Sequence, residues 1–531
     1  MENNYVNRLI PVSAAVLTGI LTLGGRGDIL LKIISVIIVY VGFIVLVKKK
    51  KVIFSIKLSP NKGTILAFLL SIYSMSLIRN RYLSDWEYYV NKIPYMPKQL
   101  SEHLFTVFLL VAFLSIFLYY MYFLAYVEKY IIQGIIKTLT EKERLYLYVF
   151  ICCMTLIIVY AHLKTSAFDY ARWINANGEI ESVPYDAILD CDSPYVINAV
   201  YNFVNVFRHP FWSYVSLPGY SLAGIVSLFF TRSDSVSMLF VSFLQMVMLG
   251  VSGICVSRLT KSRLTLLIWY TSYPVILYSV VIERHTWMTF WNVIAVYLSY
   301  EMSEKNDDWF PIYQAGGANL IGVTITPAII KFNNIKEFLI KSIKLAFGFL
   351  FVIVLTGNLT GLVRVRDEII DNERFVDHTN ILDNIRRFTV AVRSCFGGVK
   401  IRIGNHESWY NEAGFSLLGL LCIIVAIIAF LYLRNSRYAR VCAYWMGVSI
   451  ILFPLIGFAC YDYSMHMILF SWAYISLIVM LYEALIHRVN KRVLKNIFNI
   501  VILILIGWQL VTNIVVINEL MQYAVTFNYV Q

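Results

Sequence analysis

Charged side chains are scarce in this sequence. Asp, Glu, Lys and Arg make up 15% of its 531 residues, whereas hydrophobic residues make up 59%. Soluble domains carry roughly 25% charged residues, which they need to cover their surface with hydrated groups. The composition therefore excludes a soluble globular protein and predicts a polytopic membrane protein.

The sequence also lacks the short motifs of several enzyme classes. It contains no GxxxxGK[ST] phosphate-binding loop, no HExxH zinc motif and no CxxC pair. ATP-driven transport encoded in this chain is therefore not expected, and no motif identifies a cofactor. The need for a divalent metal stays open. Cys191 and Cys395, both in predicted outer regions, leave a disulfide between them open as well.

The formal net charge of +13 does not indicate nucleic acid as a partner. Lys and Arg occur in short clusters between apolar runs, where they orient membrane spans. The first such cluster, Lys48 to Lys51, lies in a loop without acidic residues and is predicted to be cytoplasmic.

Apolar runs of helical length predict an all-α protein with about 13 transmembrane helices. The runs lie near 9–24, 29–47, 63–78, 104–127, 145–162, 235–257, 264–281, 286–301, 338–356, 416–434, 441–459, 465–486 and 496–516.

Two further apolar segments are predicted not to cross simply. If 213–230 crossed, Arg258 and its basic neighbours would lie outside, so we predict a re-entrant or interfacial helix there. Segment 311–330 is interrupted by Gly316-Gly317 and Pro327, and it is predicted to enter and leave from the cytoplasmic side.

Chemically active residue types gather in the outer stretch from Asp186 to Trp212. Asp190 and Asp192 lie close together, and an amphipathic run then leads to Arg208-His209-Pro210. On the predicted topology, span 264–281 delivers Glu283, Arg284 and His285 to the same side of the membrane. We therefore predict one outer site built from both stretches.

This pattern resembles a family. Asp192-Ser-Pro-Tyr followed by Arg208-His209-Pro210-Phe-Trp resembles the first outer loop of the GT-C superfamily of polyprenyl-phosphate-dependent glycosyltransferases, which includes protein mannosyltransferases and aminoarabinose transferases. Ser272-Tyr-Pro274 through Glu283 resembles the next outward span of that family, and 316–327 its later broken helix. The sequence departs from the pattern at Ser193, where a second acidic residue is usual, and at Phe211, which replaces a second proline.

The resemblance implies transfer of a sugar from a polyprenyl-phosphate donor to a cell-surface glycan or lipid, at the outer face of the plasma membrane. Such a reaction needs a carboxylate to take the acceptor proton and cations to stabilise the departing phosphate. The resemblance implies catalytic roles for Asp192, Glu283 and His209, and substrate binding by Arg208, Arg284, Asp190 and Trp409.

The same resemblance divides the chain into four parts. They are N-terminal spans over 1–144, a catalytic membrane module over 145–356 with its outer loop at 163–212, an outer region over 357–415, and C-terminal spans over 416–531.

Simpler interpretations of the candidate residues remain. Asp192 could cap a helix, His209 could shape the turn before Pro210, and Glu283 with Arg284 could be an interfacial ion pair. Two other functions also remain. A lipid-linked polysaccharide polymerase would rely on arginines of the outer region, whereas a lipid-linked sugar flippase or exporter would place polar groups along a path through the bilayer.

Overall fold

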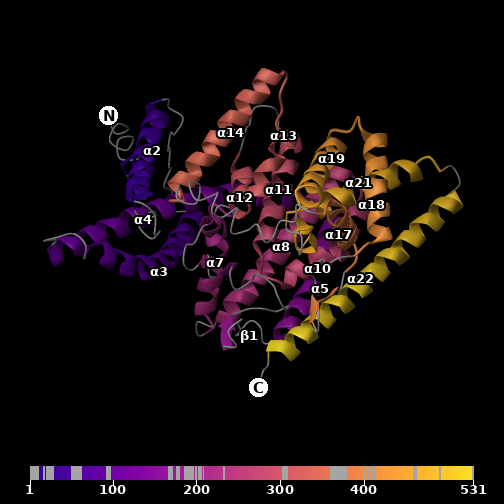
Figure 1. Cartoon of the computed structure of the whole chain (residues 1–531), viewed down its shortest axis with the longest axis horizontal. Helices are drawn as coiled ribbons and strands as arrows, with labels where there is room; N and C mark the ends of the chain where they lie inside the picture. The colour runs from indigo at the N-terminus through magenta and orange to yellow at the C-terminus, as the bar shows by residue number, and fades with distance from the viewer. Residues whose placement is uncertain are drawn as a thin grey trace. The chain divides into compact units, whose positions relative to one another are not determined.

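The computed structural model describes most of the chain. The described ranges are 29–48, 62–90, 97–165, 171–174, 180–183, 208–230, 234–301, 309–358, 380–398, 401–403, 406–408, 414–458, 463–489 and 492–528, with isolated positions among 11–19 and 196–206. Within them the protein consists of helices and two short two-stranded sheets (Figure 1).

Seven of the described helices are long and apolar enough to cross a membrane. They are Lys98–Ile136, Glu141–Lys164, Ser235–Thr260, Ile335–Leu355, Arg437–Leu455, Ile468–Ile486 and Val493–Gln522. Large apolar side chains remain exposed on several of them, including Phe347 at 70% and Trp508 at 70%. Because soluble proteins do not expose such long apolar faces, these faces meet lipid. The prediction of a helical membrane protein is confirmed.

The chain forms two compact units. The first contains Met1–Thr138, Asn198–Arg232 and Phe332–Glu368, and the second contains Leu139–Ile197, Ser233–Lys331 and Ile369–Gln531.

In the first unit, α3 packs on α4 and α7, and α14 packs on α2. Ser74, Tyr120 and Ser221 join α3, α4 and α7 through buried hydroxyl contacts of 2.6–3.0 Å. The helices of this unit are α2 (Ile29–Lys48), α3 (Lys62–Val90), α4 (Lys98–Tyr126) with its π-helical continuation η1 (Val127–Ile136), α7 (Trp212–Leu228) and α14 (Ile335–Leu355).

The second unit is built around α8 and α21, the most buried of its long helices. Its helices are α5 (Glu141–Thr165), α8 (Asp234–Thr260), α9 (Arg263–Thr271), α10 (Tyr273–Val280), α11 (Arg284–Glu301), α12 (Phe310–Ala318), η2 (Leu320–Ile325), α13 (Thr326–Ile329), α17 (Ile381–Ser394), α18 (Leu417–Leu433), α19 (Arg437–Ile450) with η4 (Ile451–Leu455), α20 (Tyr463–His466), α21 (Ile468–Ile486) and α22 (Arg492–Asn528).

Two antiparallel hairpins in the second unit were not predicted. Strand β1 (Ala171–Ile174) pairs with β2 (Ile180–Val183), and β3 (Ile401–Ile403) pairs with β4 (His406–Ser408). The sequence between β1 and β2 contains Asn177-Gly178, and only Gly404-Asn405 separates β3 from β4. These residue pairs favour tight hairpin turns, so the signal was present in the sequence.

Several helices extend beyond the predicted spans. Helix α3 continues to Val90, α4 begins at Lys98, and η1 continues to Ile136. The predicted loops 79–103 and 128–144 are therefore much shorter than expected. An apolar run marks where contact with hydrocarbon ends, whereas a helix continues for as long as its backbone hydrogen bonds are favourable.

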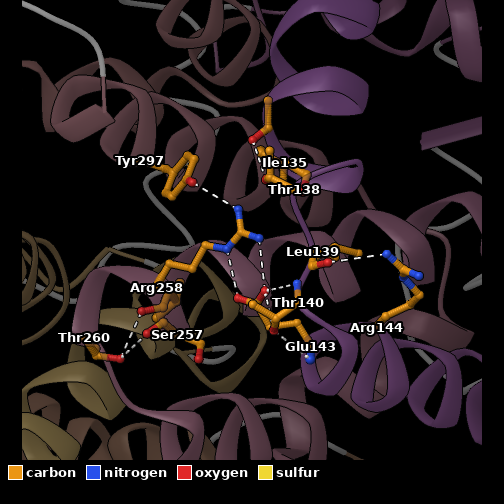
Figure 2. Close-up of polar contacts among 12 residues, drawn as sticks. Ile135, Thr138, Leu139, Thr140, Glu143, Arg144, Ser257, Arg258, Thr260 and Tyr297 are labelled. Atoms are coloured by element: carbon orange, nitrogen blue, oxygen red, sulfur yellow. Dashed lines mark hydrogen bonds and ion pairs between the residues drawn. The ribbon is translucent and has the colours of Figure 1, made fainter.

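A bidentate ion pair ties the start of α5 to the end of α8 (Figure 2). Thr140 and Glu143 form a capping box, in which the Thr140 N–H and hydroxyl donate to Glu143 Oε2 at 2.8 and 3.0 Å. Arg258 Nε and Nη2 donate to the same carboxylate at 2.9 and 3.1 Å, and Arg258 Nη1 donates to the Tyr297 hydroxyl at 3.2 Å. Helices α5 and α8 are therefore antiparallel.

This arrangement bears on the segment between the two helices. Because the start of α5 meets the end of α8, the end of α5 and the start of α8 lie at the opposite end of the unit. The two ends of the intervening chain therefore lie at the same end of the second unit. That 213–230, now α7 in the first unit, is a re-entrant or interfacial helix stays a prediction.

We expect replacement of Gly419 by alanine to destabilise the second unit. A Cβ atom at Gly419 on α18 would collide with the carbonyl oxygen of Thr389 on α17, and backbone cannot yield as a side chain can. Overpacking of this kind costs about 1–3 kcal/mol. Thermal unfolding of purified protein in detergent measures the loss. Gly447→Ala is the matched control, because a Cβ there meets nothing within 4 Å, and equal melting of both variants would contradict the close packing.

Candidate functional site

Three of the predicted site residues, Asp190, Asp192 and Trp409, lie outside the described residues. Cys191 does too, and Cys395 is a buried free cysteine. Burial raises the pKa of the Cys395 thiol well above its usual range, so this cysteine is an unreactive packing residue.

Arg208 and His209 form the turn that leads into α7 in the first unit. The His209 backbone N–H donates to the Val206 carbonyl at 3.0 Å, and the His209 side chain is buried. Asn358 donates from Nδ2 to the Pro210 carbonyl at 3.0 Å, which fixes the turn against the end of α14. This geometry agrees with the interpretation that His209 shapes the turn before Pro210.

Glu283, Arg284 and His285 belong to the second unit, at the turn between α10 and α11. Their position depends on a break between α9 and α10. Ser272 is extended, with φ −70° and ψ 145°, as expected two residues before Pro274 at the start of the next helix. The break interrupts the helical hydrogen bonds, so the freed backbone groups need other partners.

Asn513 on α22 supplies those partners. Its side-chain Nδ2 donates to the Thr271 carbonyl at 2.8 Å and to the Phe396 carbonyl at 2.8 Å. Its Oδ1 accepts the Gly398 N–H at 2.7 Å. One fully buried amide thus holds both the break between α9 and α10 and the loop after α17.

Gln245 on α8 holds the far end of α10. Its Nε2 donates to the carbonyls of Tyr278 and Val281 at 3.2 and 3.0 Å, and its Oε1 accepts the Glu283 N–H at 3.1 Å. The side chain therefore caps α10 and fixes the backbone of Glu283.

Glu283 is fully buried and is surrounded by donors. Its Oε1 accepts the Arg284 N–H at 2.8 Å, lies 3.5 Å from Arg284 Nε and 3.1 Å from His285 Nδ1. The positive end of the α11 dipole also faces this carboxylate. Glu283 Oε2 has no hydrogen-bonding partner among the described residues. Oε1 of the Glu283 carboxylate is thus bound, and Oε2 is available to another group.

His466 on α20 extends this cluster, and it was missed in the sequence. The rings of His285 and His466 meet edge to face, with centroids 4.7 Å apart. Phe453 and Phe458 flank His466, with ring centroids at 6.2 and 5.8 Å. No local pattern marks His466, because it lies far from Glu283 in the sequence and beside an apolar run.

The depth of Glu283 follows from the helices around it. Glu143 and Lys164 lie about 32 Å apart along α5 at 1.5 Å per residue, close to the roughly 30 Å of a hydrocarbon core. Gln245, which binds the Glu283 backbone, lies about 20 Å along α8 from Arg258. Glu283 therefore lies about two-thirds of the way along this length from the Arg258 end, and its side chain is fully buried. That it belongs to the outer side of the membrane stays a prediction.

The arrangement does not form a metal centre within the described ranges. No group of three or more His, Cys, Asp or Glu residues there could hold a metal ion. Glu283, Arg284 and His285 can bind an anion, share a proton or orient a hydroxyl group, because they combine a carboxylate, a guanidinium and an imidazole.

Comparison of the chain with protein-family models, with curated proteins and with solved structures finds no match.

Proposed function

We propose that this protein is a membrane glycosyltransferase of the GT-C type. It has about 13 crossings, lies in the plasma membrane and works at the outer face. It moves a sugar from a polyprenyl-phosphate donor to a cell-surface glycan or lipid. The observation that supports this most is the buried Glu283, held between α10 and α11 beside Arg284 and His285. Carboxylates at such depth are rare, and they usually serve function.

The proposed chemistry is a single displacement. An acceptor hydroxyl or amine attacks the anomeric carbon, the bond from that carbon to the phosphate oxygen breaks, and Asp192 takes the acceptor proton. Glu283 orients the acceptor through its open oxygen. Arg284 stabilises the phosphate that leaves, since a guanidinium group binds phosphate oxygens bidentately.

Transfer assays in liposomes test this proposal. Liposomes containing the purified protein are supplied with a polyprenyl-phosphate sugar and an acceptor lipid, and radiolabelled transfer is measured. Asp192→Asn is expected to lower turnover at least about 100-fold, the usual effect of losing an acid–base group. Glu283→Gln is expected to lower turnover as well, because the carboxylate that orients the acceptor is lost. Glu337→Gln is the control, because Glu337 lies in the first turn of α14, where its carboxylate contacts the nearby Lys341 and the Asn333 N–H. Full turnover in both site variants would refute the assignment.

The depth of Glu283 favours a second candidate, a lipid-linked sugar flippase or exporter. Transporters place ionisable residues inside the bilayer, where protonation changes which side is open. The same liposomes discriminate the two functions, because a flippase moves a fluorescent lipid-linked sugar across the bilayer without changing its covalent structure.

A further inference from the structure

Buried polar groups continue from Glu283 along one face of α11. Residues 285, 289 and 292 are three or four positions apart, so they share a face of the helix. Thr289 on this face donates to the Ile468 carbonyl at the start of α21 at 3.4 Å, and His285 meets His466 just before it. This face of α11 therefore packs on α20 and α21.

Helices α11 and α21 run in the same direction. Their starts meet at Thr289 and Ile468. Their far ends both approach the loop after α8, since Tyr297 accepts from Arg258 and Glu483 accepts from the Ser262 hydroxyl at 2.6 Å. Asn292 is three residues beyond Thr289, and Trp472 is four residues beyond Ile468. The two residues therefore lie at nearly the same level in this α11–α21 seam.

The polar atoms of this seam are unsatisfied within the described part of the chain. Asn292 is fully buried, and neither its Oδ1 nor its Nδ2 has a hydrogen-bonding partner there. The same holds for Trp472 Nε1, Ser464 Oγ and Glu283 Oε2. Such groups are normally satisfied by other protein groups or by internal water. The Asn292 amide has an unsatisfied donor and an unsatisfied acceptor, and the Trp472 indole at a similar level has an unsatisfied donor. Such a set suits a ligand that both donates and accepts hydrogen bonds.

The seam continues to a more exposed end. Trp472 stacks on Tyr438, with ring centroids 6.5 Å apart, and Tyr438 meets Tyr300 of α11 edge to face at 6.0 Å. The Arg437 guanidinium lies 4.7 Å from the centre of the Tyr300 ring. Tyr300 is about 25 Å along α11 from Glu283. Hydrogen-bonding side chains therefore occur at intervals between the buried Glu283 carboxylate and the end of the unit where Arg437 lies.

We propose that a file of internal water molecules lies in the α11–α21 seam and carries protons between Glu283 and the Arg437 end. Water fits better than a sugar, because Asn292 and Trp472 are fully buried between helices in direct contact. Each water can accept from Trp472 and exchange hydrogen bonds with Asn292. Arg284, His285 and His466 are the ionisable groups that surround the Glu283 end of this file. The file does not depend on the proposed glycosyl transfer.

Infrared spectroscopy of the purified full-length protein tests the file directly. The carbonyl stretch of protonated Glu283 is identified in an acid titration as the band that disappears in Glu283→Gln. After rapid mixing with D₂O, this band shifts as deuterium replaces the carboxyl proton. The rate of the shift measures how fast protons exchange between the solvent and the carboxyl group. In the wild-type protein we expect exchange within the mixing time.

Removing the polar groups of the seam is expected to slow this exchange. Asn292→Leu should slow the exchange at least about tenfold, because the loss of one water-binding group interrupts a single file of water. Trp472→Phe removes only the indole N–H donor. This second variant keeps the test valid if the leucine variant unfolds. Ser252→Ala is the control, because the buried Ser252 hydroxyl donates within α8 to Met248. Wild-type exchange rates in both seam variants, or no Glu283 band at any accessible pH, would overturn the proposal.

Discussion

Asn513→Leu is expected to destabilise the protein by about 3 kcal/mol or more. The substitution removes the side-chain partner of the partly buried Thr271 carbonyl and of the buried Gly398 N–H. It also removes one of two donors to the Phe396 carbonyl, which keeps the Tyr273 N–H at 3.2 Å. Each unsatisfied buried group costs about 1–3 kcal/mol. Leucine has the same branched shape as asparagine and is apolar and somewhat larger, so the loss does not reflect a cavity. Thermal unfolding in detergent, followed by tryptophan fluorescence, measures the effect.

The same helix provides the control for this prediction. Asn499 on α22 accepts a hydrogen bond from the Tyr482 hydroxyl at 2.8 Å on the exposed side of the helix. Asn499→Leu is expected to change stability by less than about 1 kcal/mol, because water or lipid headgroups can replace an exposed partner. Equal melting temperatures for the two variants would show that Asn513 does not hold the break between α9 and α10.

Arg258→Met is expected to lower stability by about 3 kcal/mol, since removing one partner of a largely buried pair leaves the other charge uncompensated. The side chains of Arg258 and Glu143 are only 19% and 13% exposed, and their contact is bidentate. Glu143→Gln is expected to cost somewhat less, because the amide can still accept from Arg258. Unfolding in detergent at low and high salt measures both changes.

A double-mutant cycle separates the ion pair from other effects of these substitutions. The combined variant should be more stable than the sum of the single losses predicts, by about 1 kcal/mol or more. The exposed pair between Lys341 and Glu337 on α14 is the comparison, with an expected coupling of about 0.3–0.5 kcal/mol. Additive losses at Arg258 and Glu143 would mean that the contact does not fix α5 against α8.

The membrane helices could be predicted from the sequence because burial in lipid requires long apolar runs. The run at 29–47 became α2 almost without change. The prediction that 311–330 is not one continuous helix was also correct, since the chain passes there through α12, η2 and α13. The breaks lie at Asn319 and at Thr326, because Gly316-Gly317 is inside α12 and Pro327 is inside α13. Helix ends were predicted less well. Polar residues such as those after Leu77 do not reveal whether the helix stops or continues beyond the hydrocarbon.

The candidate site could be predicted only in part. Glu283 stood out because a carboxylate between two apolar runs is rare, and the structure shows it beside Arg284 and His285. Its depth could not be predicted, since the break at Ser272 and the contact with Gln245 set it. His466, Asn292 and Asn513 were missed because each is a single polar residue within or beside an apolar run. Their roles depend on partners from distant segments.

Helix α22 also sets the hydrophobic thickness that suits this protein. No charged residue occurs between Lys495 and Glu519, a stretch of about 35 Å at the rise of an α-helix. At the far end of this stretch, Asn518 accepts from Lys164 Nζ at 2.8 Å, so α5 and α22 share one boundary. A thinner bilayer would force α22 to tilt, and α5 would have to tilt with it. The uncharged stretch of α22 is thus long enough to span an ordinary hydrocarbon core of about 30 Å with some tilt.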